Sequence, residues 1–155
     1  MQPTNEKKLC CCHAFDNHFE FQHNNRPIVV LTDKGSSTSY KYHNKTSDHL
    51  AKYQIDGGLI TDGVRCDYLL LNCEKKHSIF IEIKGSDLLH AVDQLDRSID
   101  LLKTKLLGFA VFARIVVSRM NTINLKSSRL LKLEKKLELL NGNLKYKCKI
   151  LEDTN

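Results

Sequence analysis

The residues best suited to chemistry lie in the middle of the chain, in the segment RCDYLLLNCEKKHSIFIEIKG. Asp67 precedes one apolar run, and Glu82 and Lys84 stand two residues apart in the next. Two carboxylates and an ammonium group at short range suit a divalent cation such as Mg²⁺ or Mn²⁺, which prefers oxygen ligands. Such an ion polarises a phosphate and lowers the pKa of an attacking water, while a lysine orients that water. The backbone carbonyl of Ile83 adds a further oxygen ligand.

Three successive strands must position these groups, and the sequence predicts them over residues 52–60, 66–73 and 78–84. The first two strands are separated by TDGVR, and the turn Glu74–His77 separates the last two. All three belong to a meander in which neighbouring strands pair.

The hairpin of the last two strands decides whether the site forms. The expected register places Asp67 opposite Lys84 and Leu69 opposite Glu82, with paired Cβ atoms about 5 Å apart. Because side chains alternate along a strand, Asp67, Glu82 and Lys84 then share one face, and the isoleucines of the last strand form the core face. A slip of one residue would turn Asp67 to the other face. The alternative interpretation is an exposed face of ion pairs, which would contribute little to stability.

The elements after the hairpin complete an α/β fold. A helix begins at Ser86-Asp87 and ends at Gly108, with apolar residues spaced three and four apart. The apolar run 109–117 predicts a central strand buried on both faces. A second amphipathic helix is predicted over 127–140, and a lysine-rich edge strand over 144–151. We expect a mixed central β-sheet flanked by helices, because one helical crossover follows the meander.

The N-terminal third has weaker signals. Residues 26–32 read as a strand, and residues 33–44 as a loop rich in Gly, Ser, Thr and Asn. A short helical turn is predicted from Ser47. The first twenty residues show no clear period.

The central segment resembles the signature of the PD-(D/E)XK nuclease superfamily, in particular small bacterial members with CDYL and Glu-X-Lys-Gly. Asp67 matches the first acid of that signature, and Glu82-Ile83-Lys84 matches its second part. The following helix, LLHAVDQLDRSI, resembles the one that places a glutamine near the metal, so the resemblance implies this role for Gln94. It covers about residues 50–120. It implies a single domain over residues 1–155 with a restriction-endonuclease-like core, βββαβ, to which a C-terminal helix and strand are added.

Two features depart from the superfamily's pattern. The first acid follows Cys66 where the signature has proline. The superfamily often supplies another acid from an N-terminal helix, and the candidates here are Glu20 and Asp56. Asp56 also fits a plain turn with Gly57 and Gly58.

The resemblance implies a metal-dependent nuclease that hydrolyses phosphodiester bonds, with DNA as the expected substrate and RNA left open. Small single-domain members of the superfamily usually act with a second subunit, as homodimers, or with a partner protein. The alternative is a catalytically silent nucleic-acid-binding, interaction or immunity protein that keeps the fold.

The composition agrees with a partner that carries phosphates. The chain of 155 residues has a net charge of +6 and a pI of about 9.0. A basic run in the second predicted helix indicates either a surface for the nucleic-acid backbone or an ordinary solvated helix face. The run comprises Lys126, Arg129, Lys132 and Lys136.

The cysteines and the N-terminus bear on the compartment. No apolar run reaches the roughly 18 residues that would cross a bilayer, and no signal peptide is evident, so we expect a cytoplasmic protein without a membrane segment. In a reducing cytoplasm the six cysteines are expected to be free thiols. Zinc is an alternative, although no CxxC pair exists. Its candidate ligands are Cys10, Cys11, Cys12, His13, His18 and His23.

Overall fold

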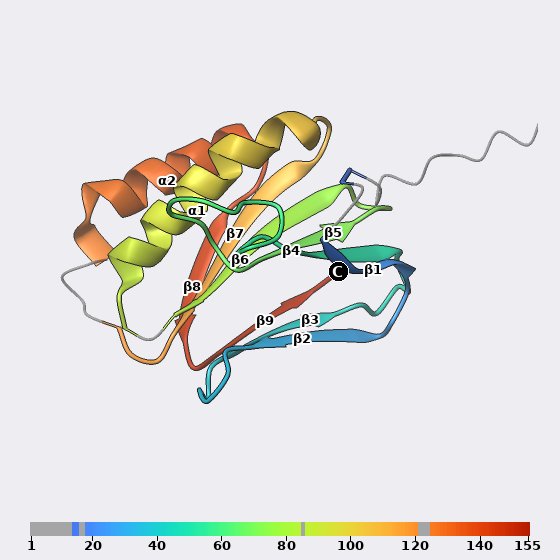
Figure 1. Cartoon of the computed structure of the whole chain (residues 1–155), viewed down its shortest axis with the longest axis horizontal. Helices are drawn as coiled ribbons and strands as arrows, with labels where there is room; N and C mark the ends of the chain where they lie inside the picture. The colour runs from blue at the N-terminus through green and yellow to red at the C-terminus, as the bar shows by residue number, and fades with distance from the viewer. Residues whose placement is uncertain (1–13, 16–17, 85, 121–124) are drawn as a thin grey trace, which may run out of the picture.

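The computed structural model describes residues 14–15, 18–84, 86–120 and 125–155, without the side chains of His23 and Lys84. In this part of the chain, nine strands form two sheets and two α-helices lie on one of them (Figure 1). The larger sheet is the middle layer, between the helices and the smaller sheet. The elements are β1 (Phe19–Asn24), β2 (Ile28–Thr32), β3 (Ser39–His43), β4 (Leu50–Gln54), β5 (Tyr68–Asn72), β6 (His77–Lys84), α1 (Leu88–Leu102), η2 (Lys103–Lys105), β7 (Ala110–Val117), α2 (Ser128–Leu139), β8 (Leu144–Cys148) and β9 (Ile150–Thr154).

The six-stranded sheet has the order β1-β4-β5-β6-β7-β8. Strands β4, β5 and β6 form an antiparallel meander, α1 crosses over, and β7 and β8 then run parallel to β6. The predicted mixed sheet with helices packed against it is confirmed. The predicted edge position of the first C-terminal strand, β8, is also confirmed.

Each face of the six-stranded sheet buries its own apolar core. On the helical side, Leu69 and Phe80 pack in one cluster with residues of α1 and α2. On the other side, Leu70 and Ile81 join a cluster with Tyr40 of the three-stranded sheet, whose order is β2-β3-β9. Burial on both faces explains why the central strands read as nearly continuous apolar runs.

The three-stranded sheet is the part that the sequence did not predict. Residues 33–44 contain β3, which pairs antiparallel with β2 and parallel with β9, so a loop over that whole range is wrong. The segment SYKYH is polar in composition, but it forms a strand in which partly buried and buried side chains alternate, and both tyrosines are buried. The helical turn predicted at Ser47 is also wrong, because Ser47 has a φ of 55° and β4 begins at Leu50.

The C-terminal strand predicted over 144–151 is in fact two strands in two different sheets. Lys149 separates them with a φ of 65°, and β9 then leaves β8 to pair with β3. The first predicted helix, which was expected to end at Gly108, is also shorter than predicted. The α-helix α1 ends at Leu102, η2 follows, and Gly108, with a φ of 86°, lies in the turn before β7.

Candidate functional site

The candidate site lies where β5 begins and β6 ends. Tyr68 pairs with Ile81 and Leu69 with Phe80, so the predicted register, with Leu69 opposite Glu82, is wrong by two residues. The reason is the turn, which spans residues 73–76. The side chain of Asn72 accepts a hydrogen bond from the N–H of Lys75 (3.1 Å) and closes this turn one residue early on the β5 side. A shift by two residues leaves every side chain of the hairpin on its predicted face.

Asp67 is fixed at the start of β5 by several hydrogen bonds. Its N–H donates to the carbonyl of Ile81 (3.2 Å), and its own carbonyl accepts from the N–H of Ile55 (2.9 Å). Its carboxylate oxygen Oδ2 accepts from the N–H of Ile83 (2.8 Å). The carboxylate of Asp67 therefore lies against the backbone immediately after Glu82, which brings together the first acid and the second part of the predicted motif.

Glu82 is buried, with only 1% of its surface exposed, on the helical side of the sheet. Its charge and that of Asp67 act on the same neighbour, Cys66. Burial raises the pKa of the Cys66 thiol, the hydrogen bond with Ser98 lowers it, and the charges of Glu82 and Asp67 raise it further. The two carboxylates thus act together on one buried thiol.

Helix α1 holds the backbone that leads to Asp67. Gln94 donates from Nε2 to the carbonyl of Arg65 (2.9 Å), and the hydroxyl of Ser98 accepts from the N–H of Cys66 (2.9 Å). Among the described residues, Oε1 of Gln94 is buried without a hydrogen-bond partner. Gln94 therefore holds Arg65, two residues before Asp67, and Ser98 holds Cys66.

Each of the two additional acids that were expected from the sequence is paired with a cation. Asp56 accepts from Nε of Arg65 (2.6 Å), and Glu20 accepts from Nζ of Lys52 (2.7 Å). Both nevertheless act on Tyr68. Burial raises the pKa of the Tyr68 phenol, and the charges of Asp67, Glu20, Asp33 and Asp56 raise it further.

Lys52 and Arg65 are charged residues that the sequence reasoning missed. Lys52 is buried, and its ammonium lies 4.7 Å from the centre of the Tyr68 ring. A lysine inside the apolar strand LAKYQI was the available signal, since such a group needs a carboxylate or aromatic partner.

The donor set fits an oxygen-liganded metal only in part. Carboxylates of Asp67 and Glu82 and the carbonyl of Ile83 are hard oxygen donors of the kind that Mg²⁺ and Mn²⁺ take, with water completing the shell. Within the described ranges, however, no three His, Cys, Asp or Glu side chains are placed to hold a metal together. Lys84 is described only by its backbone, at the end of β6. The predicted position of its ammonium group therefore falls outside the described atoms.

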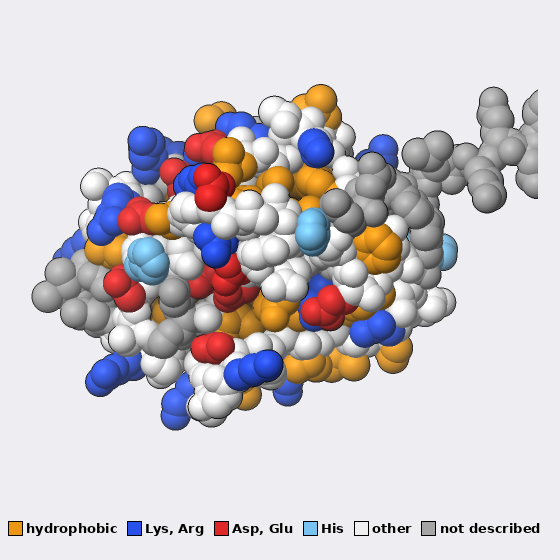
Figure 2. All heavy atoms as spheres, in the orientation of Figure 1, with side chains coloured by type: hydrophobic (Ala, Val, Ile, Leu, Met, Phe, Trp, Pro, Cys, Tyr) orange, Lys and Arg blue, Asp and Glu red, His pale blue; other side chains and the backbone are white. Residues whose placement is uncertain are grey.

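Two of the four residues in the predicted basic run are paired with α1, and Lys126 lies before α2 begins. Arg129 donates to Asp93 (2.6 Å), and Lys136 donates to Asp96 (2.5 Å) and Asp100 (2.9 Å). Lys126 and Lys132 are exposed. On the face in Figure 2, acidic and basic side chains are mixed, so that face does not form a surface of one sign.

The cysteines only partly follow the expectation of free thiols. Cys66 and Cys148 are free. Cys73 is disulfide-bonded, so the expectation is wrong at that position. The zinc ligands suggested for residues 10–13 also lie outside the described residues.

Comparisons of the chain with protein-family models, with curated proteins and with solved structures found no match. No helix in the described ranges is long and apolar enough to cross a membrane.

Proposed function

We propose that this protein is a metal-dependent nuclease with a restriction-endonuclease-like core, which hydrolyses phosphodiester bonds in DNA. The observation that carries the proposal is the meeting of Asp67 with the Glu82-Ile83 backbone, at the end of two paired strands and beside a fully buried carboxylate. The order β4-β5-β6-α1-β7 supports it, because it is the βββαβ order that the resemblance implies.

The proposed roles follow from the chemistry of each group. Asp67, Glu82 and the carbonyl of Ile83 would hold Mg²⁺ or Mn²⁺, which supplies Lewis-acid stabilisation of the phosphate and a more acidic water. The hydrogen bonds of Asp67 fix its carboxylate in advance, so little reorganisation is needed. Lys84 is the proposed cation that orients the attacking water. Gln94 maintains the backbone ahead of Asp67.

The test is cleavage of linear, circular and branched DNA, and of RNA, by the purified protein with Mg²⁺, Mn²⁺ or EDTA. We expect Asp67→Asn, Glu82→Gln and Lys84→Ala each to lower the cleavage rate by about a hundredfold or more, because each removes a group that stabilises the transition state. Glu138→Gln is the matched control, since Glu138 is an exposed carboxylate on α2.

A second measurement separates the metal site from catalysis. In calorimetric titration with Mn²⁺, Asp67→Asn and Glu82→Gln should weaken binding, whereas Lys84→Ala should retain it. Cleavage that survives in all three variants would refute the site. Metal-independent DNA binding by a wild-type protein that cuts no substrate would instead indicate a binding protein that keeps the fold.

A further inference from the structure

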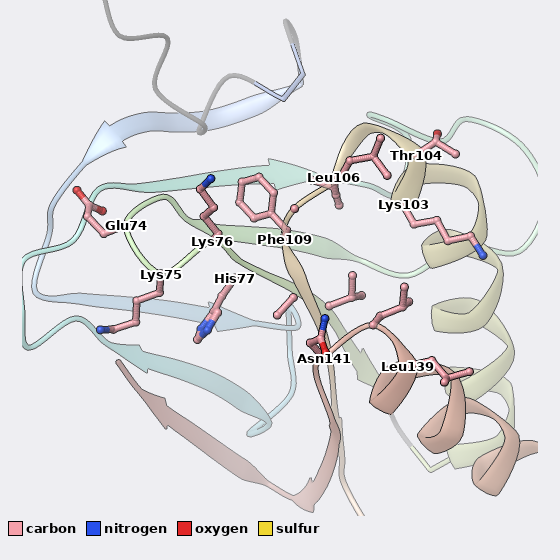
Figure 3. Close-up of a pocket in the computed structure, with 15 residues that line it drawn as sticks. Glu74, Lys75, Lys76, His77, Lys103, Thr104, Leu106, Phe109, Leu139 and Asn141 are labelled. Carbon is pink, nitrogen blue, oxygen red and sulfur yellow. The ribbon is translucent and has the colours of Figure 1, made fainter.

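A hollow lies at the end of the sheet opposite the candidate site. It has a volume of about 730 Å³ and lies among the turn before β6, the end of α1, the start of β7 and the end of α2 (Figure 3). From His77 at its wall to Glu82 is five residues along β6, or about 16 Å. The hollow is therefore separate from the candidate catalytic centre.

Two leucines at this hollow are far more exposed than any other large apolar side chain of the described residues. Leu107 is 84% exposed and Leu139 is 85% exposed, whereas the others reach at most 49%. They come from different elements but line the same hollow, together with Leu106, Phe109 and Leu140. Exposed apolar side chains gathered around a concave surface are typical of a protein-binding site.

Three lysines line the rim of the hollow: Lys75 and Lys76 come from the turn before β6, and Lys103 begins η2 (Figure 3). Lys103 donates to Asp100 (3.0 Å) and Lys75 lies 3.9 Å from Asp48, so among the described residues Lys76 is the lining lysine without an ion pair. The hollow's one lining carboxylate, Glu74, accepts from the backbone N–H of His49 (2.6 Å) and is paired with the His49 ring. A ligand with carboxylates around its apolar groups would complement this rim.

We propose that this hollow, defined by Leu107, Leu139 and Lys76, binds an acidic amphipathic segment of a partner protein. The apolar residues of that segment cover the two leucines, and a carboxylate beside them meets Lys76. A second copy of this chain is a poor occupant, because each copy carries a net charge of +6 and would present the same basic rim. A nucleic-acid backbone has no apolar group with which to cover the leucines. The proposal does not depend on the proposed nuclease activity.

The test uses three synthetic amphipathic peptides of equal length added to ¹⁵N-labelled protein. One has leucines flanked by glutamates, the second has lysines in place of glutamates, and the third has serines in place of leucines. We expect only the first peptide to bind, with amide chemical-shift changes centred on Leu107, Leu139 and Lys76.

Matched variants locate the binding surface. The double variant Leu107→Ser/Leu139→Ser should weaken affinity for the glutamate peptide at least tenfold. Leu101→Ser/Leu131→Ser, at two half-exposed leucines that do not line the hollow, should change it less than twofold. Lys76→Glu should also weaken binding, whereas Lys34→Glu, at an exposed lysine that does not line the hollow, should not. DNA cleavage should be unchanged in all of these variants, which keeps a failure here distinct from a failure of the nuclease proposal.

Several outcomes would overturn the proposal. These are equal binding of the lysine peptide, shift changes elsewhere on the protein, or no change at this surface at millimolar peptide. Light scattering that shows a dimer broken by Leu107→Ser/Leu139→Ser would assign the surface to self-association. The same shift changes on addition of a DNA oligonucleotide would assign it to nucleic acid.

Discussion

At the scale of single residues, the ion pair between Arg114 and Asp153 joins the two sheets. Arg114 of β7 donates from Nε to Oδ2 of Asp153 on β9 (2.5 Å), and both side chains are buried. Tyr40 and Lys145 donate to the same carboxylate (2.9 Å and 3.1 Å). Burial raises the pKa of Asp153, but its hydrogen bonds and the charge of Arg114 outweigh burial and hold that pKa below its ordinary value. The pair therefore stabilises the fold wherever Asp153 is ionised.

Asp153→Asn should lower the free energy of unfolding by about 3 kcal/mol at neutral pH, because it leaves the Arg114 charge buried and uncompensated. The folded-state pKa is the lower one, so this stabilisation is present above the ordinary aspartate pKa of about 3.9 and is lost as the pH falls below it. Urea unfolding of both proteins from pH 7 downwards measures the difference, which should shrink below about pH 4.

The matched control for this pair is its neighbour on β9. Glu152 forms an exposed pair with Lys41 (3.9 Å), so Glu152→Gln should cost less than about 1 kcal/mol. If Glu152→Gln lowered the free energy of unfolding as much as Asp153→Asn, burial would not explain the stabilisation by the Arg114–Asp153 pair.

At the scale of secondary-structure elements, α1 is the element that positions the candidate site. Gln94 and Arg97 donate hydrogen bonds to backbone carbonyls of residues 62–65, immediately before Asp67. The hydroxyl of Ser98 accepts from the N–H of Cys66. Asp87 begins the helix by accepting from the N–H of His90 (2.9 Å). The cap, the helix and the site backbone therefore form one connected unit.

Asp87→Ala should lower the free energy of unfolding by about 1 kcal/mol, because the first turn of α1 loses its capping acceptor. Chemical denaturation measures this cost. Ser86→Ala, at the exposed residue next to the cap, is the control and should stay within about 0.5 kcal/mol of the wild type. Equal costs would show that Asp87 does not act through capping.

At the scale of the whole molecule, the net charge of +6 is not spread as a single basic surface. The cations of Arg129 and Lys136 are neutralised by α1, whereas Lys126 and Lys132 are exposed. If the proposed DNA binding uses α2, the exposed lysines should contribute most of it.

Duplex DNA affinity should fall by about 40-fold between about 50 and 200 mM salt if about three phosphates are neutralised. Fluorescence anisotropy measures this slope. Lys126→Ala/Lys132→Ala should reduce the slope by about two, because each lysine accounts for about one phosphate. Arg129→Ala/Lys136→Ala should change the slope less, since their charges already have partners in the protein. A larger change of slope in Arg129→Ala/Lys136→Ala than in Lys126→Ala/Lys132→Ala would instead assign DNA binding to Arg129 and Lys136.

Local patterns predicted the elements that carry the candidate site. The central meander, the helix after Asp87, the doubly buried β7 and the edge position of β8 all follow from periodicity, capping and apolar runs. Residues 150–154 form a separate strand because they pair with β3, more than a hundred residues earlier in the chain. Residues 39–43 pair locally with β2, but their alternating tyrosines stand among Gly, Ser, Thr and Asn residues that are typical of a loop.

By itself, the sequence determined which residue types are available and which face of each central strand they occupy. Side chains alternate with a period of two, so a register error of two residues leaves each side chain on the same face. Only the structure showed the register of the hairpin. It also decided that Asp67 reaches Ile83, that Gln94 holds Arg65, and that Glu20 and Asp56 pair with Lys52 and Arg65. These contacts join separate elements, so they depend on packing geometry that the order of residues along one strand does not contain.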